Sequence, residues 1–215
     1  MEWYVVVAIL AGIAFVCKNA VPIGVAFRRG RVQKPKCGCD CPACAYRQTL
    51  RKLFSDHLWW TRQVIESALA ASPDLPFALA RLMRNQKDIA AVISGASEPA
   101  PGVVYRQQVA LWDQHINISV ELVGALAKGE DATNLAAEWS ANGEQIADSL
   151  WRLRPKAWTR QALRDMLAMH LSTTTAEVQA RIAGDWRADV GAVDAVVDHM
   201  MVMADALASG FAHAE

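Results

Sequence analysis

The histidines are the residues of this chain whose type and placement point most directly to chemistry. Four of the five lie on predicted helices, and apolar or small side chains flank each of them at three and four residues. Neutral imidazole is the commonest metal ligand in proteins, and helical bundles build metal sites from side chains on facing helices. The pattern therefore predicts a buried imidazole cluster formed by His57, His115, His170 and His199.

Two acidic residues could add carboxylate ligands to this cluster. Glu121 follows His115 by six residues, and Asp205 follows His199 by the same interval. Six residues correspond to about 120° on a helical wheel, so each carboxylate would lie off the face that carries its histidine. The HxxxH and ExxH spacings of familiar bundle metal sites do not occur. A divalent metal is the cofactor that such a cluster would take.

A structural role explains the same histidines. Each could donate a hydrogen bond to a backbone carbonyl or to a hydroxyl one turn away, and Thr61, Thr174 and Ser119 are suitably placed. Asn142 also falls on an apolar stripe, so its amide is predicted to join a core polar network. The two interpretations differ in geometry, because a metal site needs three ring nitrogens within about 4 Å of one point.

A second group of potential ligands lies near the N-terminus. The sequence Cys-Gly-Cys-Asp-Cys-Pro-Ala-Cys contains Cys37, Cys39, Cys41 and Cys44. Thiolates at this spacing could hold zinc, although structural zinc sites usually bring a second cysteine pair from farther along the chain. Thiols beside basic residues and a membrane are also targets of S-acylation. A reduced, flexible linker is the third interpretation, and a cytoplasmic location disfavours disulfides.

The elements that would position the histidines are helices. Beyond residue 47, apolar residues recur at intervals of three and four, while proline and glycine gather at residues 72–76 and 94–102. This pattern predicts an all-α domain with helices near residues 50–68, 77–93, 103–127, 131–153, 158–182 and 185–211.

The helical region repeats part of its own sequence at one constant offset. The correspondence pairs Leu50-Arg51, His57-Leu58 and Thr61 with Leu163-Arg164, His170-Leu171 and Thr174. Such a repeat indicates a duplicated helix pair. We therefore expect a pseudo-duplicated antiparallel bundle of about six helices with two related halves.

The N-terminal segment, from Met1 to Phe27, is almost wholly apolar, and Arg28, Arg29 and Arg31 follow at once. Twenty-five helical residues reach roughly 37 Å, enough to cross a hydrocarbon core of about 30 Å. The basic cluster should stay on the cytoplasmic side, with the N-terminus outside. We expect a transmembrane anchor over residues 1–27, a basic cysteine-rich linker over 28–46 and the bundle over 47–215. Lys18 leaves a monotopic or re-entrant segment as the alternative.

Composition disfavours nucleic acid as a partner. The chain holds 22 basic and 22 acidic side chains, and its formal net charge is zero. The basic residues form no stripe, and neither a zinc finger nor a phosphate-binding loop occurs in the sequence. The membrane and a protein are the partners that the sequence favours.

Five short motifs lie across the helical region. They are HLWWTR at 57–62, RLMRNQKDI at 81–89, WSAN at 139–142, MLAMHL at 166–171 and HMMVMAD at 199–205. Together these motifs resemble a family of small all-helical proteins found in bacilli and in some large DNA viruses, whose members carry unreliable enzyme names. The resemblance spans roughly residues 47–211 and implies one compact bundle with inward polar residues, but it brings no activity or cofactor. A viral member with an anchor would sit in an internal virion membrane.

Two functions remain open at this point. The first is a single-pass membrane-anchored interaction or scaffold module without catalysis, because no pairing of a nucleophile with a base is recognisable. The alternative is a bundle that binds a metal or small ligand through its four inward histidines, and this leaves enzymatic activity open. The sequence favours the first function.

Overall fold

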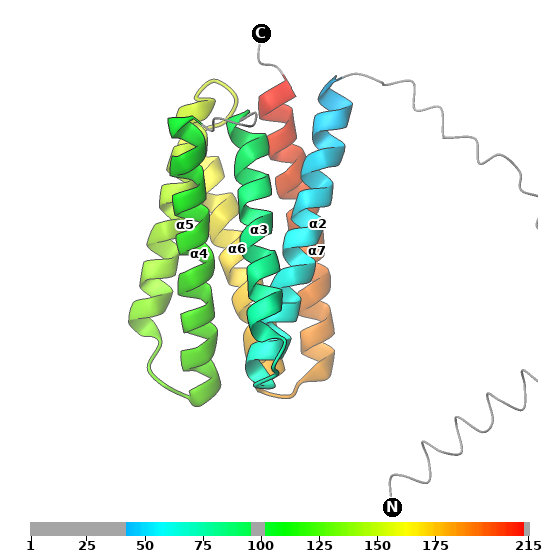
Figure 1. The fold of residues 1–215 in the computed structure, drawn as a ribbon, viewed down its shortest axis with the longest axis vertical. Coiled ribbons are helices and arrows are strands. Elements are labelled where there is room, and N and C mark those ends of the chain that lie inside the picture. Colours follow the sequence, from blue (N-terminus) through cyan, green and yellow to red (C-terminus); the bar gives the residue numbers. More distant parts are fainter. Residues whose placement is uncertain (1–41, 96–101, 213–215) are drawn as a thin grey trace, which may run out of the picture. The chain divides into compact units, whose positions relative to one another are not determined.

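A computed structural model describes residues 42–95 and 102–212 of the chain, and this part is all-helical, as predicted. Its six helices run along one another (Figure 1). They are α2 (Pro42–Leu69), α3 (Leu75–Ser94), α4 (Val103–Lys128), α5 (Thr133–Leu153), α6 (Arg160–Ile182) and α7 (Trp186–Ala212). The predicted bundle of six helices is confirmed.

The first helix starts earlier than the sequence pattern indicates. Helix α2 begins at Pro42, five residues before Arg47, so the end of the predicted linker is helical. Proline suits a first helical turn, and the Tyr46 hydroxyl donates to the Val92 carbonyl oxygen at 3.3 Å, which holds this extension against α3. Cys44 is half-buried in this extension.

The predicted anchor lies outside the described residues, and so do Cys37, Cys39 and Cys41. In the part of the chain that the structure describes, none of the helices combines the length and apolar character needed to cross a bilayer. The anchor and the state of these three cysteines therefore stay predictions.

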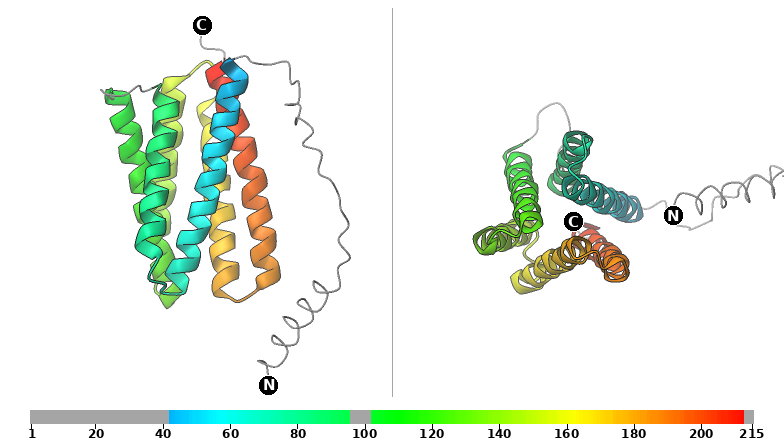
Figure 2. Two further views of the ribbon diagram at one scale, coloured as in Figure 1. Left: turned by 45° about the vertical axis from the view of Figure 1, so that its right-hand side comes forward. Right: turned by 90° about the horizontal axis from the view of Figure 1, so that it is seen from below.

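The six helices form three helical hairpins around a common centre (Figure 2). The first hairpin is α2–α3, the second α4–α5 and the third α6–α7, and α7 packs against α2 to close the ring. Helix α4 also contacts α2 and α6. The first helices of the hairpins can therefore bring their side chains together at the centre.

The helix ends follow from local backbone chemistry. Gly95 and Gly129 end α3 and α4 with φ of 63° and 70°, a left-handed conformation that glycine adopts without steric cost. At the start of α6, the Thr159 hydroxyl accepts from the Ala162 backbone N–H at 3.1 Å. Gly129 sets the turn within the second hairpin, whereas Gly95 ends the first hairpin and Thr159 begins the third.

The histidines lie where separate groups of apolar core residues meet. The residues that precede them on α2, α4 and α6, such as Phe54, Trp112 and Leu167, belong to the largest group. The residues that follow, such as Val64 and Ile65, belong to smaller groups. The histidines thus form a polar layer between apolar layers, a position that burial makes costly unless every polar atom finds a partner.

The repeated sequence motif lies on α2 and α6, which are the first helices of the first and third hairpins. The repeating unit is therefore one hairpin and not half of the domain. The second hairpin has its own histidine at the matching place, because His115 lies close to midway in sequence between His57 and His170. The expected two halves are therefore two members of a set of three.

Gly210 lies against the Trp158 ring near the end of α7. It is buried, and a Cβ at this position would overlap the Trp158 ring, whose Nε1–H donates to the Ala206 carbonyl at 3.0 Å. We expect Gly210→Ala to lower the free energy of unfolding by about 1–3 kcal/mol, because the ring must move. Denaturant titration would measure this change, and Gly191→Ala, where a Cβ meets open space, is the matched control. Equal effects of the two substitutions would contradict the prediction.

Candidate functional site: a histidine-lined cavity

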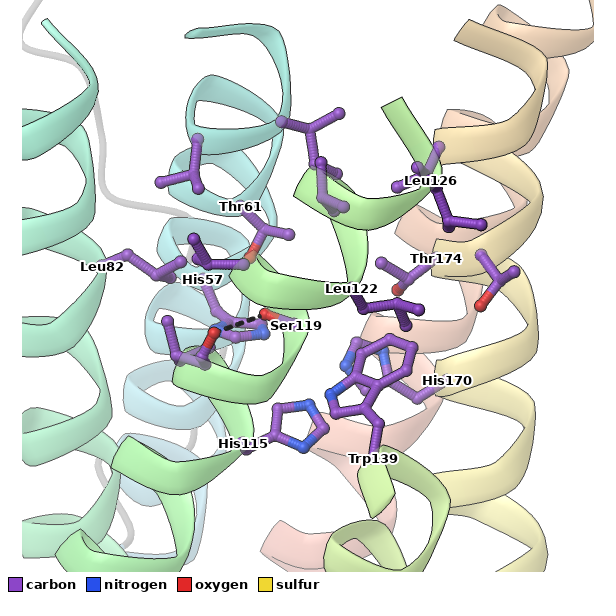
Figure 3. Close-up of a pocket in the computed structure, with 17 residues that line it drawn as sticks. His57, Thr61, Leu82, His115, Ser119, Leu122, Leu126, Trp139, His170 and Thr174 are labelled. Carbon is purple, nitrogen blue, oxygen red and sulfur yellow. Dashed lines mark hydrogen bonds between the residues drawn. The ribbon is translucent and has the colours of Figure 1, made fainter. Parts of the chain in front are cut away.

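The four predicted histidines come together in the middle of the bundle. The ring centre of His170 lies 5.8 Å from that of His57, 5.9 Å from that of His115 and 6.4 Å from that of His199. Figure 3 shows the rings of His57, His115 and His170 turned into one space from three helices. The sequence prediction of an inward histidine cluster thus describes the observed placement.

Burial keeps these imidazoles neutral. It lowers the pKa of His57 to about 3, with the neighbouring His115 adding to the effect, and lowers the pKa of His115 to about 4. The pKa of His170 falls well below its ordinary value because of burial and the other three histidines. His199 is half-buried, and burial lowers its pKa as well. Neutral imidazole is the form that binds metals.

The proton on His115 can be assigned from its neighbours. Asn142 Nδ2 donates to the Leu111 carbonyl at 3.1 Å and to Gln114 Oε1 at 3.3 Å, so the Asn142 Oδ1 atom is turned toward the histidine. That oxygen is only an acceptor, and His115 Nδ1 lies 2.9 Å from it, so Nδ1 carries the proton. The Nε2 atom of His115 therefore keeps an available lone pair.

Two other histidines have partners on neighbouring helices. Gln86 Nε2 lies 2.8 Å from His57 Nδ1 and donates to it. His199 Nε2 donates to the Met166 carbonyl at 3.0 Å. Within the described residues, these rings bond to two side-chain amides and to the Met166 carbonyl, and none of these bonds goes to Thr61, Ser119 or Thr174. A backbone carbonyl was one of the two predicted kinds of partner, whereas amides take the place of the predicted hydroxyls.

One hydrogen bond recurs in all three hairpins. In each hairpin, the first helix carries a histidine of the cluster. The backbone carbonyl four residues before that histidine accepts a hydrogen bond from a side chain on the second helix. The three donors, Asn85, Asn142 and His199, follow one another at equal intervals along the chain. The pairs are Asn85 to Leu53 at 3.0 Å, Asn142 to Leu111 at 3.1 Å and His199 to Met166 at 3.0 Å.

The cavity beside the histidines has a polar end and aliphatic walls. Thr61, Ser119 and Thr174, each four residues after a histidine, line it with Trp139. The remaining lining is mostly valine, leucine and isoleucine. The space open to the centre of a water molecule is about 30 Å³, which is room for about two waters, or for one ion with a bound water.

Unsatisfied polar atoms concentrate around this cavity. Four buried side-chain atoms without a hydrogen-bond partner among the described residues belong to residues that line it. Two more, on Asn85 and Gln86, lie on α3 beside His57. The four are Thr61 Oγ1, Trp139 Nε1, His170 Nδ1 and Thr174 Oγ1. Buried polar atoms are normally paired, so this concentration calls for an explanation.

The predicted carboxylates do not join the cluster. Glu121 is exposed on α4. Asp205 binds Arg51 of α2 through two hydrogen bonds of 2.7 and 2.5 Å. Within residues 42–95 and 102–212, no set of three His, Cys, Asp or Glu side chains stands in a ready arrangement for a metal ion. The rings lie close to one another without meeting at one point.

The sequence analysis included Asn85 and Gln86 only in a motif whose polar residues are implied to face inward, and it assigned them no partners. Both are fully buried, and both contribute to the polar layer. Their signal was present, because Asn85 precedes Asn142 by the same interval that separates Asn142 from His199. Searching for a threefold repeat in place of a twofold one would have found it.

A buried ion network near one end of the cavity was also missed. Arg62 on α2 contacts Glu177 Oε1 at 2.9 Å on α6, and both carboxylate oxygens of Asp189 on α7 at 2.5 and 2.7 Å. Arg181 binds Asp189 Oδ2 at 2.9 Å and Glu66 Oε1 at 3.1 Å. The Glu177 and Asp189 side chains are only 1% and 4% exposed. This network fixes the third hairpin against the first.

No family model matches the chain, and neither a curated protein nor a solved structure is detectably similar to it. The family resemblance drawn from the motifs therefore stays a prediction.

Proposed function

We propose that this bundle binds a small ligand or metal ion in the histidine-lined cavity at its centre. The observation that carries the proposal is the concentration of unpartnered buried polar atoms around a cavity lined by His57, His115 and His170. A ligand held there would supply the partners that the bundle itself does not.

A purely structural role accounts for these residues less well. Structural histidines in a core are retained where their hydrogen bonds are complete, because an unpaired buried polar group costs about 1–3 kcal/mol. His170 Nδ1, Thr61 Oγ1 and Thr174 Oγ1 all lack partners at one place. Leucine or valine at these positions would avoid the free-energy cost of unpaired buried polar groups. Ligand binding explains why polar side chains are present there instead.

The test is to identify what the purified protein carries. We expect the full chain, purified without added metal and with serine at Cys37, Cys39, Cys41 and Cys44, to retain close to one equivalent of a bound species. Native mass spectrometry detects a small molecule, and elemental mass spectrometry detects a metal. The serine substitutions remove the thiolates, which could otherwise bind metal outside the bundle.

His115→Gln is the control for that measurement. It keeps a polar side chain beside Asn142 but removes the imidazole lone pair. We expect the bound species to disappear from this variant while circular dichroism shows an unchanged helical content. A chain that carries nothing by either mass measurement, before or after incubation with metals, would contradict the proposed function.

We further propose that residues 1–27 hold the domain at a membrane, with the bundle on the cytoplasmic side. Docking to a protein partner at that membrane is a second candidate function. Apolar side chains exposed on α7 favour it, since Trp186 and Val190 lie one turn apart and are 63% and 61% exposed.

A further inference from the structure

We propose that His57, His115 and His170 together bind one divalent transition metal ion, with zinc and cobalt as the fitting class, and that His199 is not a ligand. This inference rests on the proposed function and names the ligand of the same cavity. It selects three of the four histidines, one from the first helix of each hairpin.

The internal repeat is the reason for choosing these three histidines and leaving out His199. His57, His115 and His170 occupy one equivalent position, because the carbonyl four residues before each accepts the recurring hydrogen bond. His199 instead occupies the position of Asn85 and Asn142 on the second helices. Three equivalent imidazoles around a common centre match the ligand set of three-histidine zinc sites.

Two of the three ring pairs have a spacing close to that of imidazoles sharing an ion. A nitrogen about 2.0–2.1 Å from zinc places ring centres about 5.2–5.6 Å apart in tetrahedral or trigonal geometry. The His57–His170 and His115–His170 centres lie 5.8 and 5.9 Å apart. An inward shift of about half an ångström would bring these two pairs to metal-binding distance. Without an ion, the described side chains do not stand in a ready three-ligand arrangement, so binding requires the rings to move together. The space of about 30 Å³ accepts the ion.

The surrounding amides are suited to orient the ligands. Metal-binding histidines usually donate their second ring N–H to an oxygen, and His115 does so to Asn142 Oδ1, which leaves Nε2 for the metal. At His57, Gln86 Nε2 donates to Nδ1, so Nε2 carries the proton in the observed arrangement. A half-turn of the Gln86 amide would make its unpartnered Oε1 the acceptor of an Nδ1–H, at the cost of the 3.5 Å contact of Gln86 Nε2 with the Leu82 carbonyl. His115 presents Nε2 as it stands, and His57 would present it after this turn.

His199 could support the third ligand in the same way. Its Nε2 donates to the Met166 carbonyl, so its Nδ1 is an acceptor. In the repeat, this Nδ1 corresponds to Asn142 Oδ1. His170 Nδ1 has no partner, and the ring centres of His170 and His199 lie 6.4 Å apart. His199 would therefore become a positioning residue for His170 if the two Nδ1 atoms moved together when the ion binds.

Three neutral ligands would leave one coordination position open to a water molecule. The hydroxyls of Thr61, Ser119 and Thr174 line the same cavity one helical turn beyond the three histidines. They are placed to accept from, or donate to, a water or hydroxide on the ion. This also gives the unpartnered Thr61 and Thr174 oxygens a partner.

Cobalt(II) titration of the full chain with serine at Cys37, Cys39, Cys41 and Cys44 tests this assignment. We expect one equivalent to bind with the intense visible absorption of a four-coordinate ion, and zinc to displace it. His115→Gln and His170→Gln should each weaken binding by more than about 100-fold. His199→Asn, which restores the residue found in the other two hairpins, should weaken it by less than about tenfold.

Each failure has a distinct meaning. Loss of cobalt from His199→Asn as complete as from His115→Gln would overturn the three-ligand assignment. A bound small molecule without affinity for cobalt or zinc would overturn the metal but keep the proposed function. A chain that binds neither would overturn both. Helical content by circular dichroism, together with the exposed-site variant Glu121→Gln as a control that leaves the cavity unchanged, separates ligand loss from unfolding.

Discussion

Replacing Arg62 with alanine should lower the free energy of unfolding by about 3–5 kcal/mol, because it leaves buried carboxylates without their counter-charge. Glu177 loses its ion-pair partner, and Asp189 keeps only Arg181. Burial already raises the pKa of Glu177, and Arg62 acts against that rise. Urea titration at neutral pH, monitored by circular dichroism, measures the change.

An exposed ion pair on the same helix supplies the control. Lys52 contacts Asp56 at 2.8 Å, with the lysine side chain 73% exposed, so Lys52→Ala should cost at most about 1 kcal/mol. Adding Glu177→Gln to Arg62→Ala should restore part of the stability, since a neutral amide is less costly to bury than a carboxylate. If Arg62→Ala costs no more than Lys52→Ala, the network does not hold the hairpins together.

Acid should destabilise the metal-free domain well before its carboxylates are protonated. The folded pKa values of His57 and His115 are about 3 and 4, and that of His170 is also low, whereas the ordinary value is 6.5. Between these values the unfolded chain binds more protons, so stability is complete above pH 6.5 and falls as the pH drops below it. At pH 5 His57 and His115 would each cost roughly 2 kcal/mol, and His170 would add to the loss in the same direction.

The histidines and the acidic groups affect stability in different pH ranges. Arginine contacts hold the pKa values of Asp148 and Asp189 below their ordinary range, so the stability that they provide is lost only below about pH 4. Glu177 acts in the opposite direction, because its pKa is raised. Thermal unfolding of chelator-treated protein from pH 7.5 to 4.5 measures the combined effect of these groups on stability.

His115→Gln isolates one histidine's share of this acid effect. The glutamine cannot titrate, so the stability lost between pH 7 and 5 should shrink by roughly 2 kcal/mol relative to the parent chain. Substituting His199, which is half-buried, should change the pH dependence less. A pH profile that His115→Gln leaves unchanged would mean that folding does not lower the pKa of His115.

Periodicity was sufficient to predict the helices. Spacings of three and four, with breaks at proline and glycine, placed all six, and α4 ends at Lys128, one residue beyond the predicted end. The start of α2 was misplaced, because a tertiary hydrogen bond from Tyr46 extends the helix into a segment rich in glycine, proline and cysteine. Local sequence carries no information about that contact.

The inward direction of the four histidines could also be predicted from the sequence, since each lies on an apolar face of its helix. The same reasoning could not exclude Asp205 as a ligand, because its partner Arg51 lies on a helix remote in sequence. It also left Gln86 without a role, although this side chain bonds to His57 across a hairpin.

The amino-acid sequence by itself determined the helices, their apolar faces and the presence of histidines on those faces, because these depend on residue type and on the 3.6-residue period of the α-helix. Only the tertiary structure decided that three hairpins close into a ring, which atoms pair within the polar layer and which remain unpartnered. These properties depend on distances between side chains remote in sequence, and packing of whole helices sets those distances.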